Sequence, residues 1–108
     1  MSETLKRINA LQRKIIIASI AYYEFDERIM SDCDYDNMSQ ELKELMIVND
    51  CPEKENSKYW YAFKDWTGAT RCFLRSRLND ADRTRLEEAA QIACEEARDY
   101  REQFLYWR

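Results

Sequence analysis

The sequence has few of the residues that build tight turns, with one glycine and one proline in 108 residues. Because these two residues supply the special backbone angles of most turns, their scarcity favours helices over a many-stranded sheet. Hydrophobic residues make up 45% of the chain and charged residues 35%, which is typical of a globular protein. This length predicts a single domain, residues 1–108, with one modest core.

Histidine is missing, and the four cysteines, Cys33, Cys51, Cys72 and Cys94, form no C-x-x-C pair. A zinc site would need one sulfur from each of four separate segments, which does not fit the usual ligand spacing. We therefore expect no metal site and no disulfide framework, but reduced thiols in the cytoplasm of a host cell. Without histidine, a serine elbow, a phosphate-binding loop or a metal cluster, an enzyme with its own activity has little support.

Long apolar runs are also missing. The run "IIIASIA", residues 15–21, is too short to span a bilayer and lies inside a longer helical pattern, so we expect neither a membrane segment nor a signal peptide. The net charge of −4 disfavours a general nucleic-acid binder. Charge is nevertheless uneven, since residues 26–56 carry ten acids and three bases, whereas residues 57–85 carry seven bases and three acids.

Hydrophobic periodicity predicts two helices in the first half of the chain. Apolar residues recur at spacings of three and four over residues 3–25 and again over residues 32–47. Ser31, with Asp34 three residues later, is a variant of the capping box and predicts the start of the second helix. Because the connection is short, we expect the two helices to form an antiparallel hairpin within residues 1–47.

The segment 59–74 fits two structures. Its aromatic residues lie at helical spacings, which favours a helix followed by a second short helix over residues 68–77, capped by Thr67. The same residues alternate as in a strand, so a β-hairpin around the single glycine is the other interpretation. The first interpretation gives an all-α fold, and the second gives an α+β fold.

The flanks of that segment are clearer. Residues 48–57 are polar and contain the proline, which predicts a loop. A last helix is predicted over residues 80–104, capped by Asn79 or Asp80, with an alanine-rich stripe suited to close packing. Residues 58–108 thus form an aromatic and helical C-terminal half.

Aromatic rings and carboxylates gather around the connection between the first two predicted helices. Tyr22 and Tyr23 end the first helix, while Asp32, Tyr35 and Asp36 share one face of the second. Such rings can stack on a flat cationic ring, and carboxylates can accept hydrogen bonds from ribose hydroxyls or neutralise positive charge. Acids also favour the first turn of any helix, and two of the tyrosines lie on core stripes. From spacing alone, this structural role is the stronger interpretation.

The pattern resembles the N-terminal helical subdomain Ia of NAD-dependent DNA ligases, which binds nicotinamide mononucleotide (NMN). The matching pieces are Tyr22-Tyr23, the D-x-x-Y-D motif of residues 32–36, and the L-x-x-L of residues 42–45. They lie within about residues 12–47, a third of the chain. In those ligases, the subdomain grips the NMN half of NAD during self-adenylation.

The resemblance assigns ligand-binding roles to five residues. It implies that Tyr22 and Tyr35 stack on or flank the nicotinamide, and that Asp32 and Asp36 contact the ribose or the charged ring. Tyr23 stands where the ligases more often have histidine. It can stack, but it cannot carry a proton at neutral pH as imidazole can.

The catalytic parts of a ligase have no match in this sequence. Adenylation needs a nucleophilic lysine in K-x-D-G, and the nearest text is "KDWTG", residues 64–68. We therefore expect a stand-alone, non-catalytic relative of the kind that phages and prophages encode. It would act as a binding module with NMN or NAD as its candidate ligand, and it would require no cofactor.

The alternative is a protein-interaction role, as an inhibitor of a host or defence complex such as an anti-CRISPR protein. The acidic stretch of residues 26–56 would then mimic a nucleic acid against a basic groove. The candidate partner-binding residues are Trp60, Trp66, Arg71, Arg75 and Trp107. Direct nucleic-acid binding through the arginines is disfavoured, because such clusters usually form a solvated face paired with nearby acids.

Overall fold

The structure is a computed structural model of the chain. It describes residues 2–48, 52–64, 66 and 74–106, with side chains as far as residue 100. Throughout these segments the chain forms helices and connecting turns without a strand, which confirms the all-α prediction. The strand alternative is wrong where the segment 59–74 is described, because Trp60–Phe63 is helix α3. The proposed cap Thr67 and residues 68–73 of the predicted short helix lie outside the described residues.

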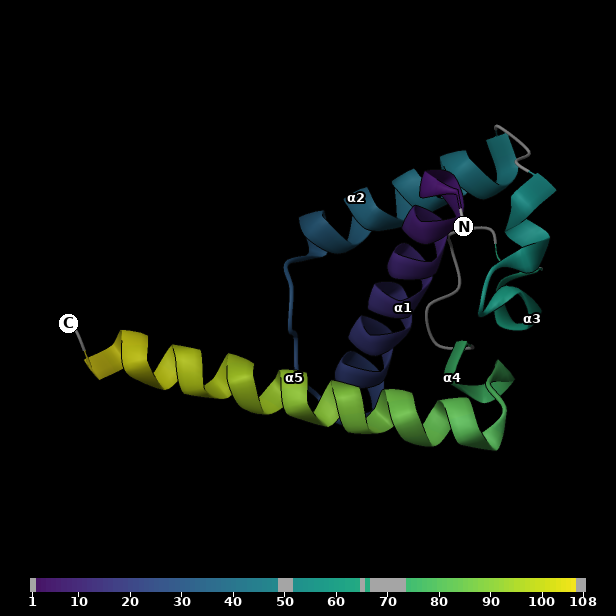
Figure 1. Ribbon diagram of the computed structural model, residues 1–108. Helices are drawn as coiled ribbons and strands as arrows, with labels where there is room; N and C mark the ends of the chain where they lie inside the picture. Colours follow the sequence, from purple (N-terminus) through teal and green to yellow (C-terminus); the bar gives the residue numbers. More distant parts are fainter. Residues whose placement is uncertain (1, 49–51, 65, 67–73, 107–108) are drawn as a thin grey trace.

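Helix α1 (Glu3–Glu24) is the central element, and its bounds agree with the prediction. It begins at Ser2, whose hydroxyl accepts a hydrogen bond from the Leu5 amide at 3.1 Å. Its apolar residues are buried on more than one side, because α2, α4 and α5 all pack against it. Figure 1 shows α1 between α2 and α5.

Helix α2 (Asp32–Lys43) begins where the capping pattern predicted, and it continues as a π-helical turn, η1 (Glu44–Val48). The Ser31 hydroxyl accepts a hydrogen bond from the Asp34 amide at 3.0 Å. The α1 and α2 helices run in opposite senses, as expected for the hairpin. Near the connection Ser19 meets Tyr35, and far from it Arg7 forms a bidentate pair with Glu41. Figure 1 shows that the two helices cross obliquely.

The Arg7–Glu41 pair joins α1 to α2 at the outer end of the hairpin. The Arg7 Nη2 atom lies 2.7 Å from Glu41 Oε1. The hydrogen bonds from the guanidinium lower the pKa of Glu41, although partial burial opposes the shift. Both side chains are substantially exposed, so the pair contributes little to stability, about 0.5 kcal/mol.

The rest of the chain wraps back onto α1 through short elements and one long helix. These are the 3₁₀ helix η2 (Pro52–Asn56), α3, α4 (Leu74–Arg77) and α5 (Asp80–Tyr106). Of the two predicted caps of α5, Asn79 is the one observed, because its Oδ1 accepts from the Asp82 amide at 2.8 Å. Helix α5 lies across the C-terminal half of α1 and then continues away from the other helices (Figure 1).

One hydrophobic cluster contains residues from both halves of the chain. Tyr59, Phe63 and Trp66 pack in it with the apolar face of α1. On α5, Leu86, Ala90 and Cys94 are fully buried, while the side chains of residues 95–100, the last ones described, are mostly exposed. The core therefore depends on contacts between residues 3–48 and the C-terminal half.

Candidate functional site

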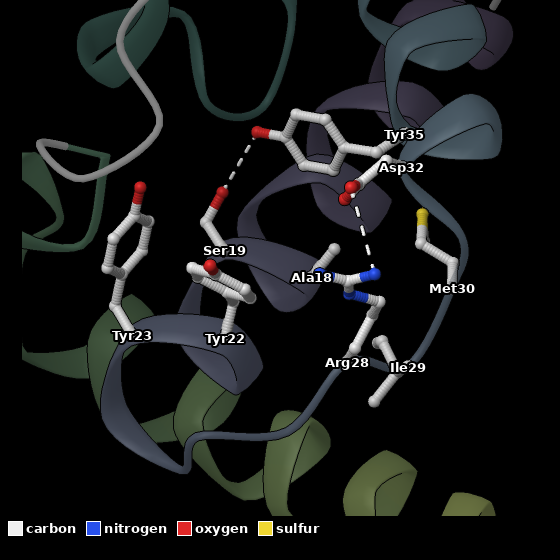
Figure 2. A pocket seen from close by; sticks show the side chains of 9 residues that line it. All are labelled: Ala18, Ser19, Tyr22, Tyr23, Arg28, Ile29, Met30, Asp32 and Tyr35. Atoms are coloured by element: carbon white, nitrogen blue, oxygen red, sulfur yellow. Dashed lines mark hydrogen bonds and ion pairs between the residues drawn. The ribbon is translucent and has the colours of Figure 1, made fainter.

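One small cavity lies between the C-terminal end of α1 and the start of α2. It is lined by Ala18, Ser19, Tyr22 and Tyr23 of α1, by Arg28, Ile29 and Met30 of the linker, and by Asp32 and Tyr35 of α2. Figure 2 shows these side chains converging from the three segments. Four of the five predicted ligand-binding residues thus surround one space.

The fifth, Asp36, has a different position. It lies on α2 one turn after Asp32, with an exposed side chain, and it is not among the residues around the cavity. The i, i+4 spacing places both carboxylates on one face of α2, as predicted. The cavity is at the N-terminal end of that face, so only Asp32 reaches it.

The two neighbouring tyrosines of α1 present exposed rings. Tyr22 is 44% exposed and Tyr23 is 50% exposed. Their ring centroids are 5.0 Å apart with an interplanar angle of 82°, which is an edge-to-face arrangement. The expectation that Tyr22 lies in the core is therefore wrong, because the core stripe of α1 ends before it. Both rings remain accessible to a flat ligand.

Tyr35 has the opposite environment. Its side chain is only 6% exposed, and its hydroxyl lies 3.1 Å from the hydroxyl of Ser19. This contact joins α2 to α1 beside the cavity. Tyr35 therefore has the structural role in the core that its position on the apolar stripe predicted. Tyr35 is nevertheless one of the residues that line the cavity. Ser19 was missed in the sequence because a serine inside an apolar run carries no signal of its own.

The linker reaches the cavity because the chain turns sharply after α1. Asp26 has a positive φ of 51°, a left-handed conformation that aspartate and asparagine tolerate better than most residues. The Glu27 amide then donates to the Ala21 carbonyl at 2.9 Å, which folds the chain back along the end of α1. Residues 28–30 consequently form a wall of the cavity.

Arg28 adds a charge to this wall. Its Nη1 atom lies 3.7 Å from Asp32 Oδ2, and more than half of each side chain is exposed. Figure 2 shows the guanidinium directed toward the carboxylate. The sequence held one signal for this residue, since Arg28 is one of only three basic residues in the acidic stretch 26–56. That signal did not indicate which carboxylate it would meet.

Helix α5 lies beside the linker, on the side away from the cavity, and contacts it. The Arg98 guanidinium pairs with the Glu27 carboxylate at 3.5 Å, and Ile29 and Met30 are partly buried against the core. Between linker and helix runs an open groove of about 570 Å³, whose walls include Arg28 and Tyr100. The cavity wall thus depends on a helix that the ligase-like motif does not include.

The cavity itself is small in this conformation. Its volume is about 20 Å³, which is enough for roughly one water molecule. A nicotinamide ring would therefore require the exposed side chains around it to move. Tyr22, Tyr23 and Arg28 can do so, because exposed side chains change rotamer rapidly.

Three of the predicted partner-binding residues have described positions. Trp66 is 3% exposed, and its ring fills the core beside Phe63, so its surface is not presented to a partner in this structure. Trp60 is half-buried against the core, with the Lys54 ammonium 5.9 Å from its ring centroid. The Arg75 guanidinium pairs with Glu87 and with Glu24, which ties α4 to α5 and α1.

The other two predicted partner-binding residues, Arg71 and Trp107, lie outside the described residues. In the described part of the chain, no group of three or more His, Cys, Asp or Glu side chains is arranged to hold a metal ion. None of the helices described combines the length and the apolar character needed to cross a bilayer.

The comparison with protein families identifies the first half of the chain. The model of a family described as "DNA ligase-like, N-terminal NAD+-binding domain" matches residues 1–57. No curated protein and no solved structure gives a significant match. The matched segment contains every residue that the structure places around the cavity, and it confirms the resemblance to the ligase subdomain. Because it is more than half of the chain, this protein belongs to the DNA ligase-like, N-terminal NAD+-binding domain family.

Proposed function

We propose that this chain is a non-catalytic binding module for a nicotinamide nucleotide, NMN or the NMN half of NAD. The observation that carries the proposal is the convergence of Tyr22, Tyr23, Asp32 and Tyr35 on one cavity. These residues come from the segment that matches an NAD+-binding family. Family membership and local geometry therefore both support this ligand class.

The chemistry of the cavity suits a positively charged aromatic ring. The faces of the exposed Tyr22 and Tyr23 rings can stack on nicotinamide, and a tyrosine face attracts a cation. The Asp32 carboxylate supplies a negative charge at the opposite wall. Tyr35 is buried and held by its contact with Ser19, so it is a fixed part of the cavity lining.

The site must open to admit the ligand, which limits the affinity. Separating the exposed Arg28–Asp32 pair requires little free energy, on the order of 1 kcal/mol or less. A ligand of about 22 non-hydrogen atoms that gains about 0.3 kcal/mol per atom would bind with a Kd on the order of 10 μM at best. We expect weaker binding than this, because an open hairpin covers only part of the nucleotide.

A heteronuclear NMR titration with NMN and NAD tests the proposal. Chemical-shift changes should cluster at residues 18–36. The Asp32→Asn variant should weaken NMN binding about tenfold by removing the charge opposite the ring, a loss of about 1.4 kcal/mol. Asp34→Asn is the matched control, because Asp34 lies in the same exposed helical turn and is not among the cavity residues. Its affinity should equal that of the wild type.

The opposite outcome is equally informative. If wild-type resonances do not move at about 10 mM NMN, where even a Kd near 1 mM would give saturation, the nucleotide proposal is wrong. The protein-interaction role would then be the remaining one, to be tested by pull-down with the folded chain. A response that is lost equally in Asp32→Asn and Asp34→Asn would indicate non-specific binding to the acidic helix end.

A further inference from the structure

Arg28 occupies the boundary between two spaces. Its side chain lines the small cavity together with Tyr22 and Asp32, and it also lines the open groove beside α5. It is held at that boundary by the turn at Asp26 and by the packing of Ile29. A ligand whose ring entered the cavity would therefore extend past the guanidinium as it emerged into the groove.

On the cavity side of this boundary the lining carries one charge of each sign, whereas the groove lining adds Glu96 beside Arg28. Among the described residues around the cavity, Arg28 carries the only positive charge and Asp32 the only negative one. NMN is also a pair of opposite charges, with a cationic ring at one end and a phosphate monoester at the other. If the ring lies beside Asp32, a phosphate directed to the groove side meets Arg28.

The existing contact between the two residues is easily exchanged. The separation of 3.7 Å is long for an ion pair, and the side chains are 56% and 62% exposed. Such a pair contributes little. Arginine, in contrast, forms paired, charge-assisted hydrogen bonds with phosphate oxygens. Binding a zwitterionic ligand would replace one weak internal pair with two contacts to the ligand.

We propose that Arg28 binds the phosphate of the nucleotide and makes the site selective for phosphorylated over unphosphorylated nicotinamide nucleosides. This inference rests on the function proposed above. Nicotinamide riboside carries the cationic ring without the phosphate. Its ring would displace Arg28 from Asp32, but the riboside has no phosphate with which the guanidinium could form a new contact. NMN satisfies both residues, and NAD places a diphosphate at the same point.

The test compares the Kd values of NMN and nicotinamide riboside by NMR titration or calorimetry for three variants. Arg28→Gln should weaken NMN binding about tenfold, while riboside binding stays unchanged or becomes a few-fold tighter because Asp32 is released. Arg28→Lys should retain most of the preference for NMN, since it keeps the charge. Arg13→Gln is the control, an exposed arginine of α1 outside the cavity, and it should match the wild type.

The pH dependence provides a second measurement. A phosphate monoester loses its second proton near pH 6. NMN should therefore bind the wild type more weakly as the pH falls from about 7.5 to about 5.5. The same change should affect Arg28→Gln much less, and it should leave the riboside affinity of both proteins unaltered. A merely structural role of Arg28 would not produce this difference between ligands.

Each outcome leads to a distinct conclusion. If Arg28→Gln weakens NMN and riboside binding by the same factor, Arg28 only positions the linker and the inference is wrong. If wild-type protein binds both ligands equally well, the nucleotide site exists but Arg28 does not select the phosphate. If wild-type protein binds neither ligand, the proposed function fails and the inference fails with it.

Discussion

The backbone amide of Tyr59 donates a hydrogen bond to the buried side chain of Gln12, with 3.3 Å between nitrogen and Oε1. The Nε2 atom of the same Gln12 donates to the Ser57 hydroxyl at 3.0 Å. Through the side-chain amide of Gln12, the central helix α1 is hydrogen-bonded to the start of the C-terminal half. This contact lies where the family-matched segment ends, at residue 57. Gln12 is fully buried and lies among apolar neighbours, so both ends of its side chain have partners inside the protein.

Replacing this amide should destabilise the whole fold. Gln12→Met keeps the length of the side chain but leaves the Tyr59 amide without its acceptor. We expect the free energy of unfolding to fall by about 2 kcal/mol, the cost of burying an unpaired polar group, as measured by urea denaturation. Gln40→Met, on the exposed face of α2, should change it by less than about 0.5 kcal/mol. Equal effects of the two substitutions would contradict the role given to Gln12.

The turn after α1 makes a prediction about backbone conformation. Asp26 is exposed and has a positive φ, a conformation that costs about 1 kcal/mol for a residue such as alanine. Asp26→Ala should therefore lower the free energy of unfolding by about 1 kcal/mol. Asp26→Gly and Asp26→Asn should be close to neutral, because both residues adopt this conformation readily. A thermal or urea melt of the three variants gives the order, and a stable Asp26→Ala protein would count against the observed turn.

Tyr61 links α3 to the start of α5 and should titrate unusually late. Burial, reinforced by its hydrogen bond to the Asp82 carboxylate at 2.5 Å, raises the pKa of the hydroxyl to about 12. In the unfolded chain the pKa is about 10. Since the folded value is higher, the stability from this contact is complete below about pH 10 and is lost as the pH rises through the folded pKa.

Two measurements check the behaviour of Tyr61. The difference in tyrosinate absorbance between wild type and Tyr61→Phe isolates this one hydroxyl, and its midpoint should lie near pH 12 rather than near pH 10. The free energy of unfolding of the wild type should decline above about pH 10 more steeply than that of Tyr61→Phe. A midpoint at the unperturbed value would show that the contact with Asp82 does not form in solution.

The two carboxylates of the D-x-x-Y-D motif should differ in their contribution to ligand binding. Asp32 lines the cavity and Asp36 does not. Asp32→Asn is expected to weaken NMN binding about tenfold, whereas Asp36→Asn should change the Kd by less than about threefold. The motif alone implies similar losses for both residues. NMR titrations of the two variants therefore test the geometry of the site separately from its family pattern, and equal losses would show that the bound form of the hairpin brings Asp36 to the ligand.

Local patterns in the sequence predicted most of the first half of this protein. The bounds of α1 and α2 follow from apolar spacing, and the start of α2 follows from the side chain of Ser31. The tyrosine pair and the D-x-x-Y-D motif predicted five residues around one site, and four of them line the cavity while Asp36 does not. All of these features depend on residues within one or two helical turns of each other, and such spacing fixes which side chains share a helix face.

Residues between and after those helices were harder to predict. The aromatic segment around Trp66 fitted a strand almost as well as a helix. Tyr59, Tyr61 and Phe63 alternate as on one face of a strand, while Tyr59, Phe63 and Trp66 are spaced as on one face of a helix. In the structure, Tyr59, Phe63 and Trp66 are buried in the core, whereas Tyr61 is 38% exposed. An aromatic ring on a short helix can be an exposed anchor or a core residue, and only the position of α1 beneath it decides between them. The same sequence pattern was consistent with both.

Local sequence patterns were enough to predict helices α1, α2 and α5, the cap of α2 at Ser31, and the chemical groups of the candidate site. Tertiary structure decided which of those groups meet: it left Asp36 outside the cavity, brought Arg28 to Asp32, and placed α5 behind the linker. The physical reason is the range of the interactions. Helical periodicity and capping act over three or four residues, whereas the cavity is formed where the ends of two helices and a turned linker pack against a helix some sixty residues away in the sequence.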